Sequence, residues 1–246
     1  MVTADLDSLG IRPGCRVLDA GCGTGRHVGA LHRFPGVSVF GLDPDLRDLH
    51  QTRERMHHLG EWTRHPENRW NVLSGDVRTL PFPDGVFDLV ICSEVLEHID
   101  RDEKAAAEIV RVLKPGGDLV VSVPRFTPER ICWALSTAYH LAEGGHVRIY
   151  RHSQVIRLIQ RHGKMQLRRF HFAHGLHSPF WWLKCLVGPE RTDVRLVNLY
   201  HRFLTWDLMR NPRLTRWLER LINPLIGKST VFYFRKEGGG LERRER

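Results

Sequence analysis

Residues 17–25 read VLDAGCGTG, an apolar run that leads into three glycines, each separated from the next by one residue. An apolar strand that ends in closely spaced glycines lets the backbone approach a ligand that any Cβ would block. The spacing differs from the GxGxxG fingerprint of dinucleotide sites, and the turn lacks the lysine of a P-loop. By itself, the segment predicts either a ligand-binding turn or a plain connection from strand to helix.

Residues 16–123 alternate strand-like and helix-like runs around this segment, as stacked βα units do. Strands are expected at 16–20, 38–42, 71–74, 87–93, 118–123, 166–172 and 229–235. Helices are expected at 27–33, 45–59 and 102–113. The pattern predicts an α/β fold with a seven-stranded, mostly parallel sheet and helices on both faces.

Two segments, 126–145 and 173–228, are additional to the strands and helices that a minimal α/β sheet needs. We expect both to lie over the carboxyl ends of the strands, where such sheets bind ligands. The expected domain therefore comprises 1–172 with 229–236, and it carries a helical, Trp-rich insertion at 173–228. The polar residues 237–246 are expected to form a disordered tail.

Two acids stand where further strands end. Asp43 closes the second strand 18 residues after Gly25, and Asp76 follows the third strand. An acid at the first position can accept both ribose hydroxyls of a nucleotide, and one at the second can accept an adenine amino proton. Each acid is also compatible with a helix cap, but their combination with the glycine turn favours a nucleoside ligand.

These motifs together resemble the class I S-adenosylmethionine-dependent methyltransferase family. The resemblance covers roughly residues 10–165: VLDAGCGTG is similar to the first motif, FGLDPD to the ribose-binding motif, and LKPGGDLVVSVP to the junction before the fifth strand. It implies a Rossmann-like fold and S-adenosylmethionine as cofactor. It also implies a contact with ribose for Asp43, with adenine for Asp76 and Val77, and with the methionine moiety for a further set: Asp19, Gly21, Gly23, Gly25 and Ser93.

A second element, Glu94-Val95-Leu96-Glu97-His98, follows the fourth strand. If a helical turn begins at Glu94, its two carboxylates and the imidazole share one face and can hold a divalent cation such as Mg²⁺. The triplet resembles the Glu-x-x-Glu-His element of ubiquinone-biosynthesis O-methyltransferases, which implies a later histidine, here His146, as a further ligand. The alternatives are a metal-free catalytic site containing His98, with Glu97 and His146, and a structural role.

The acceptor has to be inferred from composition and from the two added segments. The formal charge of +9 suits anionic partners, and Trp181, Trp182 and Leu183 beside Lys184 resemble an interfacial pairing, although they also suit a core under a lid. We expect O-methylation of a small hydrophobic or lipid-like acceptor, with peripheral membrane contact. The alternatives are an RNA 2′-O-methyltransferase, disfavoured because no RNA-binding module is recognisable, and a silent cofactor-binding protein.

Five scattered cysteines without a CxxC pair argue against a zinc ribbon and suit reduced core thiols. The N-terminal sequence lacks an apolar h-region, so no signal peptide is expected. Both features favour a cytoplasmic protein that can lie peripherally at a membrane.

Overall fold

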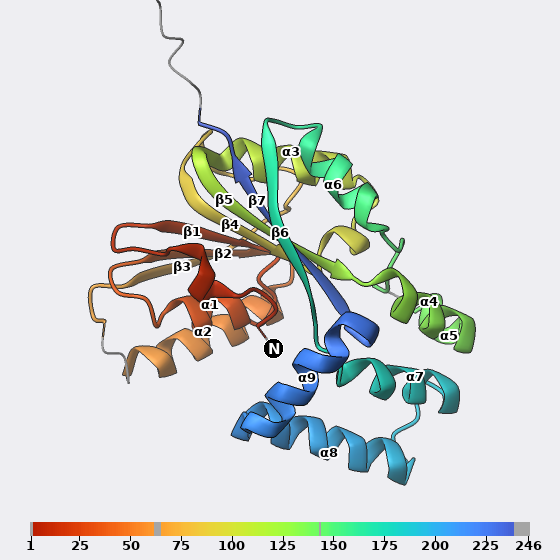
Figure 1. The fold of residues 1–246 in the computed structure, drawn as a ribbon. Helices are drawn as coiled ribbons and strands as arrows, with labels where there is room; N and C mark the ends of the chain where they lie inside the picture. The colour runs from red at the N-terminus through yellow and green to blue at the C-terminus, as the bar shows by residue number, and fades with distance from the viewer. Residues whose placement is uncertain (1, 62–64, 143, 239–246) are drawn as a thin grey trace, which may run out of the picture.

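The computed structural model describes residues 2–61, 65–142 and 144–238 (Figure 1). Most of the expected tail, residues 239–246, lies outside this range. Among the described residues, no helix combines the length and apolar character needed to cross a bilayer.

A seven-stranded sheet forms the centre of the molecule, with the strand order β3-β2-β1-β4-β5-β7-β6. β1 to β5 pair in parallel, and β7 runs antiparallel to both of its neighbours. The bounds are β1 Arg16–Ala20, β2 Ser38–Asp43, β3 Arg69–Ser74, β4 Phe87–Ser93, β5 Leu113–Pro124, β6 Met165–Ala173 and β7 Ser229–Lys236. The predicted fold class is thereby confirmed.

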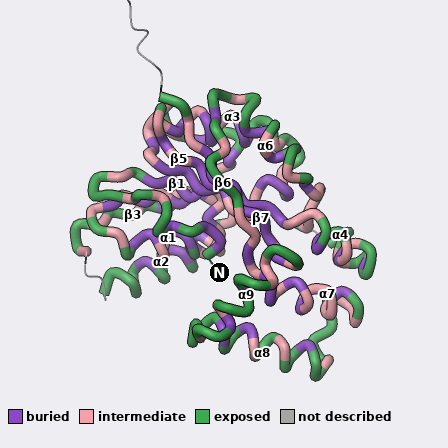
Figure 2. The backbone as a smooth tube through the Cα atoms, viewed as in Figure 1, coloured by how far each residue is buried: buried purple, intermediate pink, exposed green. Residues whose placement is uncertain are grey.

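Helices cover both faces of this sheet. Along β4, Leu89 and Ile91 pack toward one face, in the cluster that includes α1 and α2, whereas Val90 and Cys92 pack toward the other, with α3 and α6. Successive strand residues point to opposite faces, so a strand covered on both sides is apolar throughout. The bounds are α1 Arg26–Leu31, α2 Leu46–Glu61, α3 Asp102–Val112 and α6 His152–Gln160. Figure 2 shows the buried residues concentrated in the sheet.

The predicted start of the fifth strand, at residue 118, is wrong by five residues. β5 begins at Leu113, which pairs with Phe87, and its register then shifts before Asp118 pairs with Leu89. The sequence Lys114-Pro115-Gly116-Gly117 signals the end of a helix, and α3 does end just before it. Gly116, at φ +75°, supplies the irregular backbone that lets the strand ladder continue across these turn residues.

The two additions to the sheet are helical and touch each other. The first contains α4 (Phe126–Leu135) and α5 (Thr137–His140), and the second, residues 173–228, contains α7 (His177–Val187), α8 (Arg195–Arg210) and α9 (Arg213–Ile226). Trp182 of α7 donates its indole N–H to the Pro128 carbonyl of α4 at 3.1 Å. The second addition has a small apolar core of its own, which includes Phe180 and Leu204.

Candidate cofactor and catalytic site

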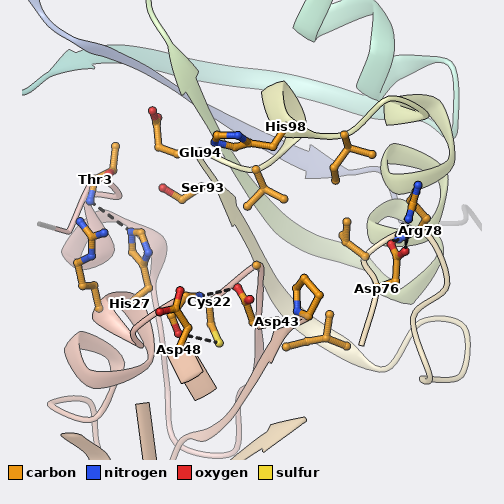
Figure 3. A pocket seen from close by; sticks show the side chains of 18 of the residues that line it. Thr3, Cys22, His27, Asp43, Asp48, Asp76, Arg78, Ser93, Glu94 and His98 are labelled. Atoms are coloured by element: carbon orange, nitrogen blue, oxygen red, sulfur yellow. Dashed lines mark hydrogen bonds and ion pairs between the residues drawn. The ribbon is translucent and has the colours of Figure 1, made fainter. Parts of the chain in front are cut away.

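A cavity of about 650 Å³ opens at the carboxyl ends of β1 to β4 (Figure 3). Gly21 follows β1 and Ser93 ends β4, and both line the cavity. β1 and β4 are neighbours in the sheet but their chain connections run to opposite sides, which makes this the switch point where open α/β sheets bind ligands. The cavity therefore lies where the glycine turn was expected to meet a ligand.

The glycine turn forms the floor of the cavity, and its backbone has left-handed φ angles that glycine tolerates. Gly21 has φ +80°, and a Cβ on it would lie 2.3 Å from Cγ2 of Val95. Gly23 also lines the cavity, whereas Gly25 packs against Thr52 of α2 and is not a lining residue. The first two glycines thus line the cavity, and the third packs the turn against α2.

Asp43 stands at the end of β2 with its carboxylate fixed by two backbone amides. Oδ2 accepts a hydrogen bond from the N–H of Gly23 at 2.8 Å, and Oδ1 accepts one from that of Asp45 at 3.0 Å. Each carboxylate oxygen keeps a further lone pair. Because Asp43 also lines the cavity, it is a preoriented acceptor for two donors of a ligand.

Asp76 and Val77 follow β3 and line the opposite end of the cavity. The Asp76 carboxylate is engaged by Arg78, whose Nε lies 3.0 Å from Oδ1 and 2.9 Å from Oδ2. This contact lowers the pKa of Asp76. Both side chains are about 40% exposed, and an ion pair so exposed contributes little stability. A ligand donor can therefore share the carboxylate without a large energetic cost.

Asp19 does not line the cavity, in contrast to the other acids of the predicted cofactor set. It is a buried residue of β1, and burial raises the pKa of its carboxyl to about 8, with the charge of Asp43 adding to the rise. In this conformation the Asp19 carboxyl does not reach the cavity. It can influence a bound ligand only indirectly, by supporting the glycine turn.

His27 and Thr3 line the cavity but were not singled out in the sequence. The buried Nε2 of His27, on α1, accepts a hydrogen bond from the backbone N–H of Thr3 at 3.2 Å and so holds the N-terminal segment beside the cavity. The one feature of the sequence that could have identified His27 as a cavity residue is its position two residues after Gly25. Nothing in residues 2–5 indicates this contact.

Acidification should destabilise the fold through His27. Burial, together with the nearby charge of Arg26, lowers the pKa of His27 from 6.5 to about 4. Its contribution to stability is therefore complete above pH 6.5 and is lost as the pH falls toward 4, to a maximum of about 3 kcal/mol. Thermal unfolding between pH 7 and 4.5 tests this.

The control for that measurement is His27→Gln, which keeps an acceptor but does not titrate. Its melting temperature should fall less steeply with pH than that of the wild type. Parallel pH profiles for the two proteins would exclude His27 as the titrating group.

Ser93 and Glu94 lie at the end of β4 and share a hydrogen-bonded chain with Ser122 of β5. Ser122 Oγ donates to Glu94 Oε1 at 2.9 Å and lies 2.8 Å from Ser93 Oγ. Since the hydroxyl of Ser122 has one proton, Ser93 must be the donor to Ser122. The side chains of Ser93 and Glu94 are thus both positioned by Ser122 of the neighbouring strand.

The expected helical turn beginning at Glu94 is wrong. Glu94 has φ +56°, and a short 3₁₀ turn spans only Leu96–His98. The i, i+3, i+4 spacing therefore does not place Glu94, Glu97 and His98 on one helix face. Glu94 lines the cavity, whereas Glu97 turns into the protein and is fully buried.

Glu97, His98 and His146 are nevertheless brought together, with one potential ligand atom from each lying within 4.8 Å of the others. Both carboxylate oxygens of Glu97 lack a hydrogen-bond partner among the described residues. Burial, with the charge of Glu94, raises the pKa of Glu97 well above its ordinary value. His146 Nδ1 lies 2.6 Å from Oε1 of Glu129, so its orientation is fixed by a carboxylate.

His98 is the member of this trio that lines the cavity, and its ring lies beside Glu94 in Figure 3. Its Nδ1 lies 3.2 Å from the carbonyl oxygen of Gly145, which can only accept, so the neutral ring carries its proton on Nδ1. Burial and the proximity of His146 lower the pKa of His98. Nε2 is therefore an unprotonated acceptor at neutral pH.

A second donor group contains His174, His177 and Glu219, again with atoms within 4.8 Å of one another. The guanidinium of Arg216 already lies 2.6 Å from Oε2 of Glu219. A cation at this place would have to compete with that charge, so the group is better described as part of the polar packing of the second addition.

Comparisons with known proteins agree with the fold and the cofactor motifs. Residues 18–121 match the family model described as a methyltransferase domain. A ubiquinone/menaquinone biosynthesis C-methyltransferase of Pasteurella multocida is 36% identical over 118 residues, which are 47% of this chain and 42% of that protein. A sterol 24-C-methyltransferase of Gibberella zeae is 36% identical over 110 residues, which are 45% of this chain and 28% of that protein.

Among solved structures, the YcgJ protein from Bacillus subtilis superimposes with a TM-score of 0.61 at 18% sequence identity, covering 95% of this chain and 96% of that one. This likeness concerns the fold alone. The chain spans less than half the length of the two curated relatives. The residues that match the family model, 18–121, contain the glycine turn and the acids Asp43 and Asp76. Residues 18–121 are thus similar to a methyltransferase domain, and the fold around them resembles that of the YcgJ protein.

Proposed function

We propose that the protein transfers the methyl group of S-adenosylmethionine to oxygen of a small hydrophobic, lipid-like acceptor. The observation that carries this proposal is the cavity itself, which has nucleoside-binding groups at one end and an unprotonated imidazole, His98, at the other. Its volume of about 650 Å³ suits a cofactor together with part of an acceptor.

The cofactor has a natural orientation in this cavity. Asp43 accepts the two ribose hydroxyls, and Asp76 with the amide of Val77 holds the adenine. The methionine moiety lies over Gly21 and Gly23, beside Ser93. This arrangement would bring the sulfonium methyl group near Glu94 and His98, because these residues line the cavity next to Ser93 (Figure 3).

The reaction needs alignment, exclusion of water and removal of one proton. As the acceptor oxygen attacks the methyl carbon, the carbon–sulfur bond breaks and S-adenosylhomocysteine remains. The hydroxyl proton passes to Nε2 of His98. Donation from Nδ1 to the Gly145 carbonyl keeps the ring in the tautomer that can accept it.

Transfer to carbon is the second candidate, favoured by the names of both curated relatives, which are C-methyltransferases. A base is also required when an activated ring carbon loses a proton after methylation. The structure of the labelled product therefore distinguishes the two candidates, since an ether or ester methyl and a carbon-bound methyl differ in their NMR shifts.

The proposed function is tested in two steps with the full chain. Calorimetry with S-adenosylmethionine and S-adenosylhomocysteine should show saturable binding of both. A radiolabelled methyl-transfer assay on lipid, RNA and polar extracts should then label the lipid fraction. No saturable binding would overturn the assignment of the cofactor, and label confined to RNA would overturn the acceptor class.

Gly21→Ala should weaken cofactor binding by at least tenfold. The new Cβ would lie 2.3 Å from Val95 Cγ2 on a backbone at φ +80°, which an L side chain rarely adopts, so the turn must shift. Gly10→Ala is a matched control, because its φ is +58° but a Cβ added there would meet no atom within 4 Å. Calorimetry measures the affinity, and equal affinities for the two variants would contradict the role of Gly21.

A divalent cation is the alternative activator of the acceptor. The donor set of Glu97, His98 and His146 fits a cation by its chemistry and by the unpartnered oxygens of Glu97. When bound, a cation would lower the pKa of an acceptor hydroxyl.

We expect EDTA treatment followed by desalting to leave turnover unchanged, because His98 removes the proton without a metal. Turnover is measured with the labelled-methyl assay before and after treatment. A loss of activity that Mg²⁺ or another divalent cation restores would assign the role to a cation instead.

A further inference from the structure

α9 turns its apolar side toward solvent. Leu214, Trp217, Leu218, Leu221 and Leu225 follow a spacing of three or four residues, which places them on one face of the helix. Their exposed fractions are 73, 58, 38, 52 and 74%. An amphipathic helix of a folded domain normally buries such a face. We call these five residues the apolar face of α9.

The opposite side of α9 packs against the protein through Ile222 and several polar groups. Thr215 and Glu219 are buried, and Arg216 forms ion pairs with Glu219 and with Asp207 of α8. The helix is therefore held by a defined ionic contact on its inner side. The exposure of the apolar face is a consequence of this packing.

α8 continues the exposed apolar surface. It joins α9 through Asn211 and Pro212, and Figure 2 shows much of both helices as exposed. Five of its large apolar residues are between 49 and 78% exposed: Leu196, Leu199, Trp206, Leu208 and Met209. Large apolar side chains exposed in this number on two successive helices mark an interaction site.

The charge on these two helices indicates what covers them. Five arginines are exposed: Arg195, Arg202, Arg210, Arg213 and Arg220. The two acids of α8 and α9, Asp207 and Glu219, are both buried and paired with Arg216. The outward charge of the pair is thus entirely positive, as in helices that lie on anionic membranes. A second copy apposed through the same face would bring like charges together.

We propose that α8 and α9 dock on an anionic lipid bilayer, with the apolar face of α9 at the boundary between headgroups and acyl chains and the arginines among the headgroups. The sequence had pointed to Trp181, Trp182 and Lys184 for such contact. Those side chains are half-buried, and Lys184 Nζ lies 2.6 Å from the Pro189 carbonyl oxygen. The docking surface lies on the following two helices instead.

Docking also gives the proposed acceptor a source, and this part of the inference rests on the proposed function. The addition that carries the surface is joined to the sheet at the ends of β6 and β7, and its α7 contacts α4, which follows β5. Docking would therefore hold the protein at the surface from which a lipid-like acceptor has to be taken.

Co-sedimentation of the full chain with vesicles tests the docking. Vesicles of phosphatidylcholine with 30% phosphatidylglycerol, an amount on the order of that in anionic membranes, should bind at least tenfold more protein than phosphatidylcholine alone. The double variant Trp217→Ser, Leu221→Ser should lose at least nine-tenths of this binding. Leu46→Ser is the matched control, because Leu46 is a 67% exposed leucine on α2, and it should bind as the wild type does.

The remaining outcomes are also decisive. Arg213→Glu with Arg220→Glu should abolish the preference for anionic vesicles. Absence of vesicle binding, or a concentration-dependent dimer that the Trp217 variant abolishes, would overturn the proposal. Calorimetry with S-adenosylmethionine on every variant reports cofactor binding by the folded protein independently of docking, so loss of docking and failure of the proposed function are distinguishable.

Discussion

Asp43→Ala should weaken the binding of S-adenosylmethionine by about 10²- to 10⁴-fold, because the variant loses two charge-assisted bonds to ribose, each contributing about 1.5–3 kcal/mol. The same substitution also releases the amide of Gly23, which Oδ2 holds at 2.8 Å, so the glycine turn loses part of its preorganisation. Both effects act on the cofactor and neither depends on the identity of the acceptor. Calorimetry with S-adenosylhomocysteine measures the change without turnover.

Two further variants make that result specific. Asp43→Asn keeps one oxygen acceptor but loses the charge, so its affinity should lie between those of the wild type and the alanine variant. Asp45→Ala removes a neighbouring acid that does not line the cavity, and it should bind the cofactor as the wild type does. An unchanged affinity for Asp43→Ala would remove Asp43 from the site.

The cofactor end of the site could be predicted from sequence because each of its residues is tied to a strand end. The glycine turn, Asp43 and Asp76 all follow apolar runs, and the carboxyl ends of parallel strands meet at one edge of the sheet. The apolar runs in the sequence and the parallel topology of the sheet therefore both place these residues at the same edge. The burial of Asp19 was harder to predict. The alternation of side chains along a strand does not show which of them lies beneath the following glycine turn.

The acceptor end could not be predicted in the same way. Glu94 takes a left-handed backbone conformation that is unusual for a residue with a side chain, so the assumption of a regular helical turn failed there. The contacts of Glu97 and His146 depend on the loop after α5, which is distant in sequence. No periodic pattern specifies such a loop.

The exposure of the apolar face of α9 shows a further limit of pattern-based prediction. Leucine spacing identifies which residues share one side of a helix, but it does not reveal which side the protein covers. Here the ionic contact of Arg216 with Asp207 and Glu219 sets the orientation. These groups lie nine and three residues from Arg216 in the chain, and only the packing of α8 on α9 brings all three together.

His98→Ala should lower turnover by about 10²- to 10⁴-fold, the usual contribution of a positioned general base, while cofactor affinity stays within about twofold. The separation is expected because His98 lies across the cavity from Asp43 (Figure 3). His58→Ala, on the exposed side of α2, is the matched control and should retain full turnover. Comparable turnover of the two variants would exclude His98 as the base.

Glu97→Gln distinguishes the base from a cation ligand. Burial raises the pKa of Glu97 well above its ordinary value, which favours the uncharged carboxyl that the isosteric amide resembles. If His98 is the base, Glu97→Gln should keep turnover within a few-fold of the wild type. If Glu97 held a cation, the amide would be a much poorer ligand and turnover would fall as far as it does in His98→Ala. The same assay thus identifies which chemistry activates the acceptor.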